Sequence, residues 1–177
     1  MSNFPRKCVI DTNVPITANR ARCPEETPPE LAECVLASVE AVEHVVKQGG
    51  LVLDFGDEIF DEYRNHLSMK GQPGVGDFFM KWVHDNRWKS SKADRVEIEK
   101  IGVSYKEFPD HEGLSEFDDA DRKFVAVSNA HPDKPPILQA TDSKWWGWKE
   151  ALNEVGITVQ FLCPDYVRTK FEKKIGT

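Results

Sequence analysis

The sequence predicts an α/β fold, an α/β/α sandwich around a mostly parallel central sheet. Three short apolar runs, at positions 8–10, 51–53 and 137–140, are typical of strands that are buried on both faces. Longer segments between them repeat apolar residues at three- and four-residue spacing, which is typical of helices. The order strand, helix, strand at the amino end predicts a right-handed βαβ unit.

The first predicted helix follows the first strand and a polar segment around Pro15 to Pro24. Its start is expected at 27–30, with Thr27 as N-cap and Glu30 completing a capping box. Its buried face is expected to comprise Leu31, Cys34, Val35, Val39, Val42, Val45 and Val46, and Gly49 and Gly50 should end it.

The second strand ends at Asp54, and Asp57 is expected to cap a helix through about residue 70. A loop at 71–76 leads to a helix ending near Trp88 and then to a charged, partly extended segment. The region 71–108 is therefore expected to be an elaboration on a single domain that spans residues 1–177, since no linker divides the chain.

The remaining elements follow the same alternation. A helix is expected to open at 118–121, where carboxylates suit the positive end of a helix dipole. The strand at 137–140 leads into Thr141 and Asp142, then a helix with Trp145, Trp148, Leu152 and Val155 on its apolar side. A strand at 157–162 and a short basic helix after Pro164 complete the prediction.

Composition and charge limit the cellular location and the kinds of partner that we expect for this protein. No apolar run approaches the roughly 20 residues that span a bilayer, and residues 1–7 lack a signal-peptide pattern, so we expect a cytoplasmic protein without a membrane partner. The cysteines form no C-x-x-C pair, so free structural thiols are expected at Cys8, Cys23, Cys34 and Cys163. A net charge of −7 argues against a broad nucleic-acid platform but allows a nuclease whose metal ions contact the phosphates.

Acidic residues recur at the predicted strand ends and helix starts. Asp11, Asp54 and Asp142 end strands, and the helix starts carry either Glu58 or Glu62, and then Asp118, Asp119 and Asp121. In a parallel sheet these ends share one edge, so the carboxylates should converge and repel, which favours a bound cation. Hard oxygen ligands suit Mg²⁺ or Mn²⁺, although any one of these acids, such as Asp57, Asp118 or Asp119, can also be a plain helix cap.

Four ordered motifs resemble those of the PIN domain nucleases. They are VIDTN at 9–13, IFDEYRNHL at 59–67, DRKFVAV at 121–127 and LQATD at 138–142. The resemblance implies a PIN-like fold with Asp11, Glu62, Asp121 and Asp142 as catalytic residues and ligands of Mg²⁺ or Mn²⁺. It places the second ligand at Glu62 rather than Glu58, leaves open whether Asp118 or Asp121 binds the metal, and makes Asn13 and Thr141 the residues that orient the ligands.

The function implied by this resemblance is metal-dependent endoribonuclease activity on single-stranded RNA. Many family members are toxins, so an antitoxin protein and a second copy of the chain are expected as candidate partners, although this chain is longer than the small toxins. The alternatives are a PIN-like RNA- or protein-binding module that does not cut, and a phosphohydrolase or receiver-like domain. The last would want a strand-borne lysine that faces the aspartates, and none is evident.

Candidate nucleic-acid contacts lie outside these motifs. Lys89 and Lys92 belong to a segment with six basic residues between 81 and 100, interleaved with Trp82 and Trp88 and diluted by four acidic residues. In the tryptophan cluster at 145–148, Trp145 and Trp148 share core spacing, so Trp146 is the one expected to be exposed and able to stack a base.

Overall fold

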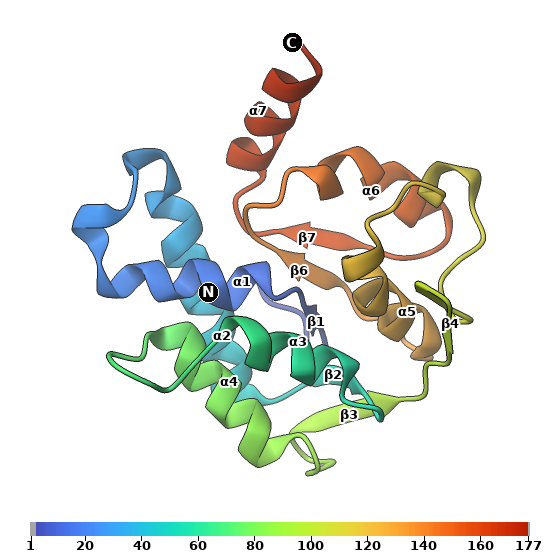
Figure 1. The fold of residues 1–177 in the computed structure, drawn as a ribbon, viewed down its shortest axis with the longest axis horizontal. Coiled ribbons are helices and arrows are strands. Elements are labelled where there is room, and N and C mark those ends of the chain that lie inside the picture. The colour runs from blue at the N-terminus through green and yellow to red at the C-terminus, as the bar shows by residue number, and fades with distance from the viewer. Residues whose placement is uncertain (1–2, 177) are drawn as a thin grey trace.

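The computed structural model describes residues 3–176 and has the predicted α/β class with mostly parallel strands (Figure 1). One sheet has the order β1-β6-β7, with β1 at Val9–Ile10, β6 at Ile137–Gln139 and β7 at Val159–Phe161, all parallel. A second pairs β2 at Leu51–Asp54 in parallel with β3 at Ala93–Val96. An antiparallel hairpin joins β4 at Lys100–Ile101 to β5 at Ser104–Tyr105.

Backbone hydrogen bonds join the two parallel sheets through β1 and β2. The Cys8 amide donates to the Gly50 carbonyl (3.0 Å), and the Val52 amide donates to the Cys8 carbonyl (2.9 Å). The strands therefore follow one another in the order β3-β2-β1-β6-β7, with carboxyl ends on one edge. Because Cys8 lies opposite Leu51, Asp11 and Asp54 occupy matching positions just past β1 and at the end of β2.

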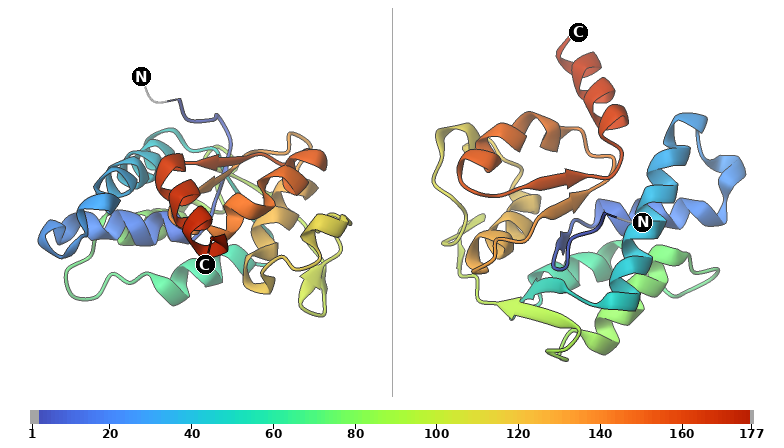
Figure 2. Two further views of the ribbon diagram at one scale, coloured as in Figure 1. Left: turned by 90° about the horizontal axis from the view of Figure 1, so that it is seen from above. Right: turned by 180° about the vertical axis from the view of Figure 1, so that it is seen from behind.

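Seven α-helices lie in residues 3–176, as shown from two further sides in Figure 2. Helix α5 packs against β1 and β2, α6 packs against β7, and α1, α2 and α4 pack on one another. Helix α7 contacts α6 and projects from the rest of the molecule in both Figure 1 and Figure 2. Their bounds are α1 Asn13–Ala18, α2 Ala32–Gln48, α3 Glu58–His66, α4 Val75–Asn86, α5 Arg122–Ala130, α6 Lys144–Glu154 and α7 Pro164–Ile175.

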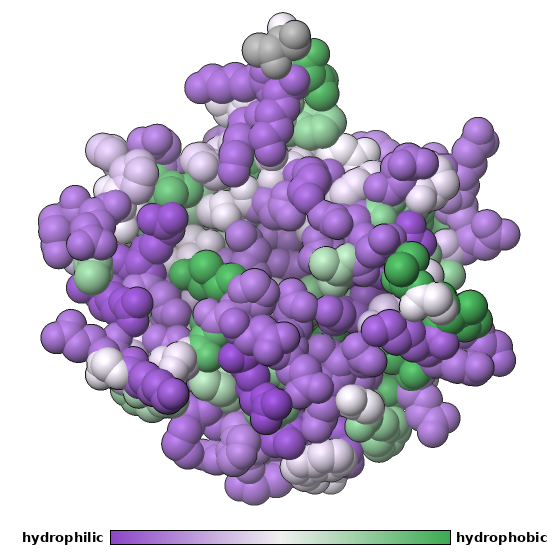
Figure 3. Space-filling view, viewed as in Figure 1, coloured by the Kyte–Doolittle hydropathy of each residue, from purple (hydrophilic) through white to green (hydrophobic). Residues whose placement is uncertain are grey.

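The strands supply the centre of the hydrophobic core. Val9, Ile10, Leu51 and Ile137 are completely buried. The face drawn in Figure 3 is mostly hydrophilic, with separate hydrophobic spots. Within residues 3–176, each helix is too short or too polar to cross a lipid bilayer.

The start of α2 differs from the prediction. Thr27 does not cap the helix, because its hydroxyl donates to the Cys23 carbonyl (3.3 Å), and the helix begins at Ala32 after a 3-10 turn at Pro29–Leu31. Pro28 is extended, with φ −56° and ψ 141°, as expected for a residue that precedes another proline. This conformation separates Thr27 from the first helical turn, so the expected capping box with Glu30 is wrong.

The prediction of four free thiols is wrong for two cysteines. Cys34 on α2 and Cys163 at the start of α7 form a disulfide, with Cα atoms 5.2 Å apart. Cys8 and Cys23 are free. The 129 residues between the bonded cysteines gave no spacing motif, and only the packing of α7 beside α2 brings them within bonding range.

The segment 71–108 contributes more than a surface extension. It supplies α4, the β4–β5 hairpin and β3, whose register with β2 runs from Leu51 opposite Ala93 to Asp54 opposite Val96. Strand β3 pairs with β2 on the side away from β1, so the segment 71–108 supplies one of the two edge strands in the order β3-β2-β1-β6-β7.

Candidate functional site

Asp11 is placed by β1 and buried beneath α3. The Asp11 amide donates to the Leu138 carbonyl of β6 (3.2 Å), and the Tyr63 hydroxyl donates to the Ile10 carbonyl (2.6 Å). The side chain is 4% exposed, and its Oδ1 accepts from the Asn13 amide (2.8 Å). The second oxygen, Oδ2, is buried and accepts no hydrogen bond of normal geometry from any residue between 3 and 176. A buried carboxylate oxygen without a donor costs free energy unless another positive group or a proton reaches it.

Two further aspartates act on Asp11 through their charge. Asp121 lies at the amino end of α5, and Asp142 follows β6 and accepts from the Lys144 amide (3.0 Å). Burial, then the charge of Asp121, and more weakly that of Asp142, raise the pKa of Asp11 well above its usual value, against opposing hydrogen bonds from the Asn13 backbone and the Gln139 side chain. The structure therefore brings Asp11, Asp121 and Asp142 together at the carboxyl edge, as the strand-end pattern predicts.

Asp121 is the centre of a cluster of carboxylates that we call the acidic group, which comprises Asp11, Glu62, Asp118, Asp121 and Asp142. Burial raises its pKa to about 6, with further contributions from the charges of Asp142, Asp118 and Glu62. Asp118 lies farther out, where it forms an ion pair with Lys144. The charge of Asp121 thus raises the pKa of Asp11 directly, whereas the charge of Asp118 raises the pKa of Asp121.

Glu62, rather than Glu58, belongs to this group. Its charge reaches Asp121, and its Oε2 lies 2.8 Å from the Lys123 ammonium in a largely buried ion pair. The Glu58 carboxylate instead accepts from the Tyr105 hydroxyl (3.1 Å) and acts on Asp54. Glu58 and Glu62 lie one turn apart on α3, so their carboxylates contact different residues.

Asn13 and Thr141 connect the two loops that carry Asp11 and Asp142. The Asn13 amide group donates to the Thr141 hydroxyl (2.9 Å), and the Thr141 backbone amide donates to Asn13 Oδ1 (2.6 Å). Because the Asn13 backbone also donates to Asp11, this pair fixes the loop after β1 relative to the loop after β6. The geometry is that of residues which orient others.

Two lysines of the acidic group had not been singled out from the sequence. Lys123 binds Glu62 and Lys144 binds Asp118. The hydrogen bond to Asp118, and then the charges of Asp142, Asp118 and Asp121, raise the pKa of Lys144. Each lysine follows one of the predicted aspartates by two residues, at 121–123 and at 142–144. That repeated Asp-x-Lys spacing was the available signal. Both cations reduce the repulsion among the carboxylates.

The acidic group is looser than a closed metal cage. In the described range 3–176, the set of three acidic or sulfur side chains whose ligand atoms lie within 4.8 Å of one another is Cys23, Glu25 and Glu26, on the surface. Exposed acidic groups of this kind are common without a metal. The charges of Glu62 and Asp142 raise the pKa of Asp121, and those of Asp121 and Asp142 raise the pKa of Asp11, without the four carboxylates being gathered that tightly.

The three predicted nucleic-acid contacts do not form one surface. Lys89 and Lys92 lie in the turn before β3, whereas Trp146 lies on α6 beside β7, at the opposite edge of the strand order (Figure 1). Trp146 is half-buried against Phe161, with ring centroids 5.2 Å apart, rather than exposed. Trp145, as its spacing predicts, is completely buried.

No family model, curated protein or solved structure matches this chain, so the argument for function rests on the site itself.

Proposed function

We propose that this protein is a metal-dependent endoribonuclease that hydrolyses phosphodiester bonds of single-stranded RNA. The observation that carries the proposal is the buried Asp11 carboxylate, whose Oδ2 forms no hydrogen bond of normal geometry within residues 3–176, although the Gln139 side chain lies near the carboxylate, and which lies in the field of two further aspartates. Such an arrangement is stabilised by a cation, and oxygen ligands favour Mg²⁺ or Mn²⁺.

The carboxylates of the acidic group suit a metal ion in their chemistry, although Glu62 would first have to leave Lys123. Asp11, Asp121 and Asp142 would hold it, and Glu62 would join after exchanging its contact with Lys123. A bound ion of this type lowers the pKa of water and stabilises negative charge on a phosphoryl group. Asn13 and Thr141 orient the Asp11 loop, while Lys123 and Lys144 limit the repulsion among the acids.

The finer structural and cellular assignments belong to this proposal. A PIN-like three-layer arrangement is supported by the parallel strand order and by Glu62 and Asp121 meeting near Asp11. A cytoplasmic location is also proposed, although the Cys34–Cys163 disulfide weighs against it, since disulfides are rare in reducing compartments. The toxin role, the antitoxin and the homodimer stay predictions from the sequence.

The alternative is a PIN-like module that binds RNA or protein without cutting. The Lys123–Glu62 pair favours this alternative, because it satisfies a predicted ligand without a metal ion. The two functions differ in one respect that can be measured: only the enzyme requires the unpaired Asp11 oxygen for turnover.

The deciding experiment is cleavage of labelled single-stranded RNA with Mn²⁺ or Mg²⁺, compared with EDTA. We expect metal-dependent cutting that Asp11→Asn reduces at least 100-fold, because even residues that only orient ligands contribute about 10- to 100-fold. Asp61→Asn is the matched control, since it makes the same chemical change at an exposed position next to Glu62. RNA binding by a folded wild-type protein that cuts with neither metal would establish the binding module instead.

A further inference from the structure

Three arginines and three aromatic rings alternate across a surface built by α3, β3 and the segments that follow β2 and α4. The Arg95 guanidinium carbon lies 4.0 Å from the Trp88 ring centroid and 4.6 Å from that of Phe55. The Arg87 guanidinium lies 4.1 Å from the Phe60 centroid and 5.2 Å from that of Trp88. We call this series the arginine–aromatic ladder, and its members in order are Phe55, Arg95, Trp88, Arg87, Phe60 and Arg64.

The two ends of the ladder differ in burial and in whether their arginine has a partner within the protein. Phe60 is buried, and Arg87 donates to the Asp57 carboxylate (3.1 Å), so this end stabilises the fold. At the other end Phe55 is 49% exposed and Trp88 is 56% exposed. Arg95 between them forms no ion pair with a carboxylate of residues 3–176, and its Nη1 is shielded from water without a hydrogen-bond acceptor. The open end therefore offers two partly exposed rings and a guanidinium charge that no carboxylate of residues 3–176 pairs with.

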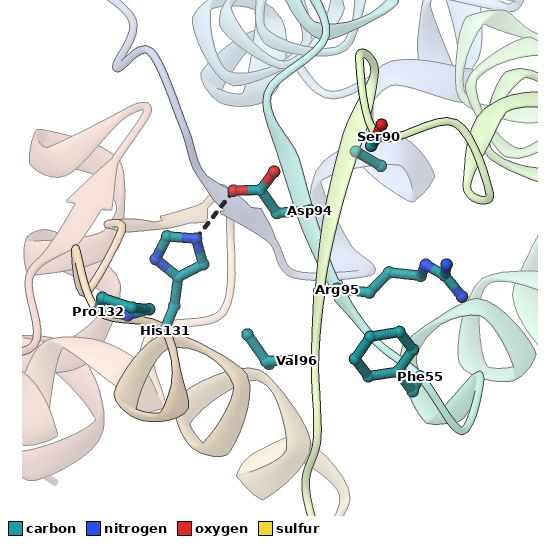
Figure 4. Close-up of a pocket in the computed structure, with 8 residues that line it drawn as sticks. Phe55, Ser90, Asp94, Arg95, Val96, His131 and Pro132 are labelled. Carbon is teal, nitrogen blue, oxygen red and sulfur yellow. Dashed lines mark hydrogen bonds and ion pairs between the residues drawn. The ribbon is translucent and has the colours of Figure 1, made fainter.

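A pocket of about 320 Å³ opens beside this end (Figure 4). Phe55, Arg95 and Ser90 line it on one side of β3, and the His131–Asp94 pair lies on the other side of that strand. The Asp94 carboxylate is bound by His131 (2.9 Å) and Lys7 (2.8 Å), and the hydrogen bond from Lys7 lowers the pKa of Asp94. The acid of the pocket is thus already neutralised and repels an anion weakly.

The local charge is opposite to that of the whole chain. Residues 87–95 contain four basic side chains and one acidic one, which is Asp94, in a protein of net charge −7. Lys89 is exposed in the turn before β3, where its ammonium group donates to Asn86 Oδ1 (3.3 Å). Positive charge beside exposed rings favours a ligand that carries both phosphates and flat bases.

Phe55 lies on the same edge as Asp11, whereas Trp88, Lys89 and Lys92 precede β3 and lie toward the opposite edge. Phe55 follows the last residue of β2, Asp11 follows the last residue of β1, and these two parallel strands are neighbours. Neighbouring strands are about 4.8 Å apart, so an extended ligand that crosses the ladder can continue from Phe55 to the acidic group along this edge.

We infer that Phe55, Arg95 and Trp88 form a binding site for unpaired bases of single-stranded RNA, with Lys89 and Lys92 contacting its phosphates. The inference rests on the proposed nuclease function for the choice of RNA, and it names the path by which the strand reaches Asp11. Bases stack on the exposed faces of Phe55 and Trp88, and the Arg95 guanidinium between the two rings holds them in place and adds positive charge.

The test measures binding rather than cutting. A labelled oligouridine of about 12 nucleotides, within the site sizes of single-strand binders, is titrated in EDTA with the wild type, Trp88→Ala and Phe55→Ala. Each variant should weaken binding at least about 5-fold, the loss expected for one stacked base. Phe78→Ala is the matched control, because it removes a ring that is 55% exposed on α4, and it should bind as the wild type does. Circular dichroism establishes that each variant is folded.

The outcomes separate this inference from the proposed activity. Unchanged affinity of both ladder variants, or no RNA binding by the wild type, would overturn the base site even if the enzyme cuts RNA with Mn²⁺. Weakened binding without any cutting by the wild type would support the base site and overturn the nuclease. Competition by an oligoglutamate of equal length as strong as that of unlabelled RNA would overturn the choice of nucleic acid in favour of an acidic peptide.

Discussion

The ends of β1 and β2 carry the same residue in matching positions and use it differently. Asp54 is 1% exposed, and both of its oxygens accept from helix α3, from the Glu58 amide (2.8 Å) and the Ile59 amide (3.0 Å). Asp11 is equally buried but accepts one backbone bond and leaves Oδ2 without a hydrogen bond of normal geometry. Burial raises the pKa of both, yet only Asp11 lies near other aspartates. A strand-end aspartate is therefore a helix cap in one place and a candidate ligand in the other.

The largest expected effect is the loss of stability in Asp54→Ala. Removing a carboxylate that accepts two backbone donors should lower the free energy of unfolding by about 3 kcal/mol, at about 1.5 to 3 kcal/mol for a hydrogen bond to a charged group. Urea denaturation measures this change. Asp11→Ala, which removes one such bond and an uncompensated charge, should lower it by less. Equal losses of stability in Asp54→Ala and Asp11→Ala would contradict the proposed difference between the two aspartates.

The next effect is a dependence of stability on pH in EDTA. The raised pKa values mean that folded Asp11 and Asp121 (about 6) hold protons that the unfolded chain has released above about pH 4. The free energy of unfolding should therefore fall as pH rises from 4 through 6, by on the order of 2 kcal/mol. Denaturation at a series of pH values measures the slope.

Two controls locate that slope. Asp121→Asn should reduce the slope, because it removes one of the two titrating groups and one of the charges that raise the pKa of Asp11, and Asp54→Asn should leave most of the slope in place. Saturating Mg²⁺ should also flatten it, because a cation favours the ionised carboxylates. A slope that Asp121→Asn leaves unchanged would assign the titration to other groups.

Asn13→Ala should weaken Mn²⁺ binding by about 10- to 100-fold, the range for residues that orient ligands. The variant loses the side-chain bonds to Thr141 but keeps the backbone donor to Asp11. Calorimetric titration measures the affinity, and Asn65→Ala on α3 provides a control away from the loops. A change in RNA affinity with unchanged Mn²⁺ affinity would contradict the orienting role.

The smallest expected effect is a gain in stability from Asp11→Asn in EDTA. Replacing a buried carboxylate that faces like charges with a neutral amide should raise the free energy of unfolding by about 1 kcal/mol. The same substitution at Asp54 should lower it, because the amide presents one acceptor oxygen to two donors. Thermal melting of the two variants side by side measures the difference in sign.

These contrasts indicate what the sequence could and could not reveal. Buried strands leave continuous apolar runs, so β1, β2 and β6 were predictable, whereas β3 lies in a charged segment because edge strands carry polar residues. Asp11 and Asp54 looked alike because a cap and a ligand both need a carboxylate at a strand end. Asp57, expected to cap α3, instead pairs with Arg87, since its left-handed backbone (φ 60°) leaves the cap to Asp54. The disulfide and the ladder depend on packing between distant segments, which spacing does not encode.

The Cys34–Cys163 bond encloses most of the chain in a single covalent ring. Glu62, Asp121 and Asp142 lie within the ring, and Asp11 lies on the arm that precedes it. A protease that cuts once in the loop at 71–74 would leave Asp11 and Glu62 on one piece and the other two acids on the second. The bond would still hold both pieces in one molecule, so a nicked protein would run as a single band until a reductant separated its halves.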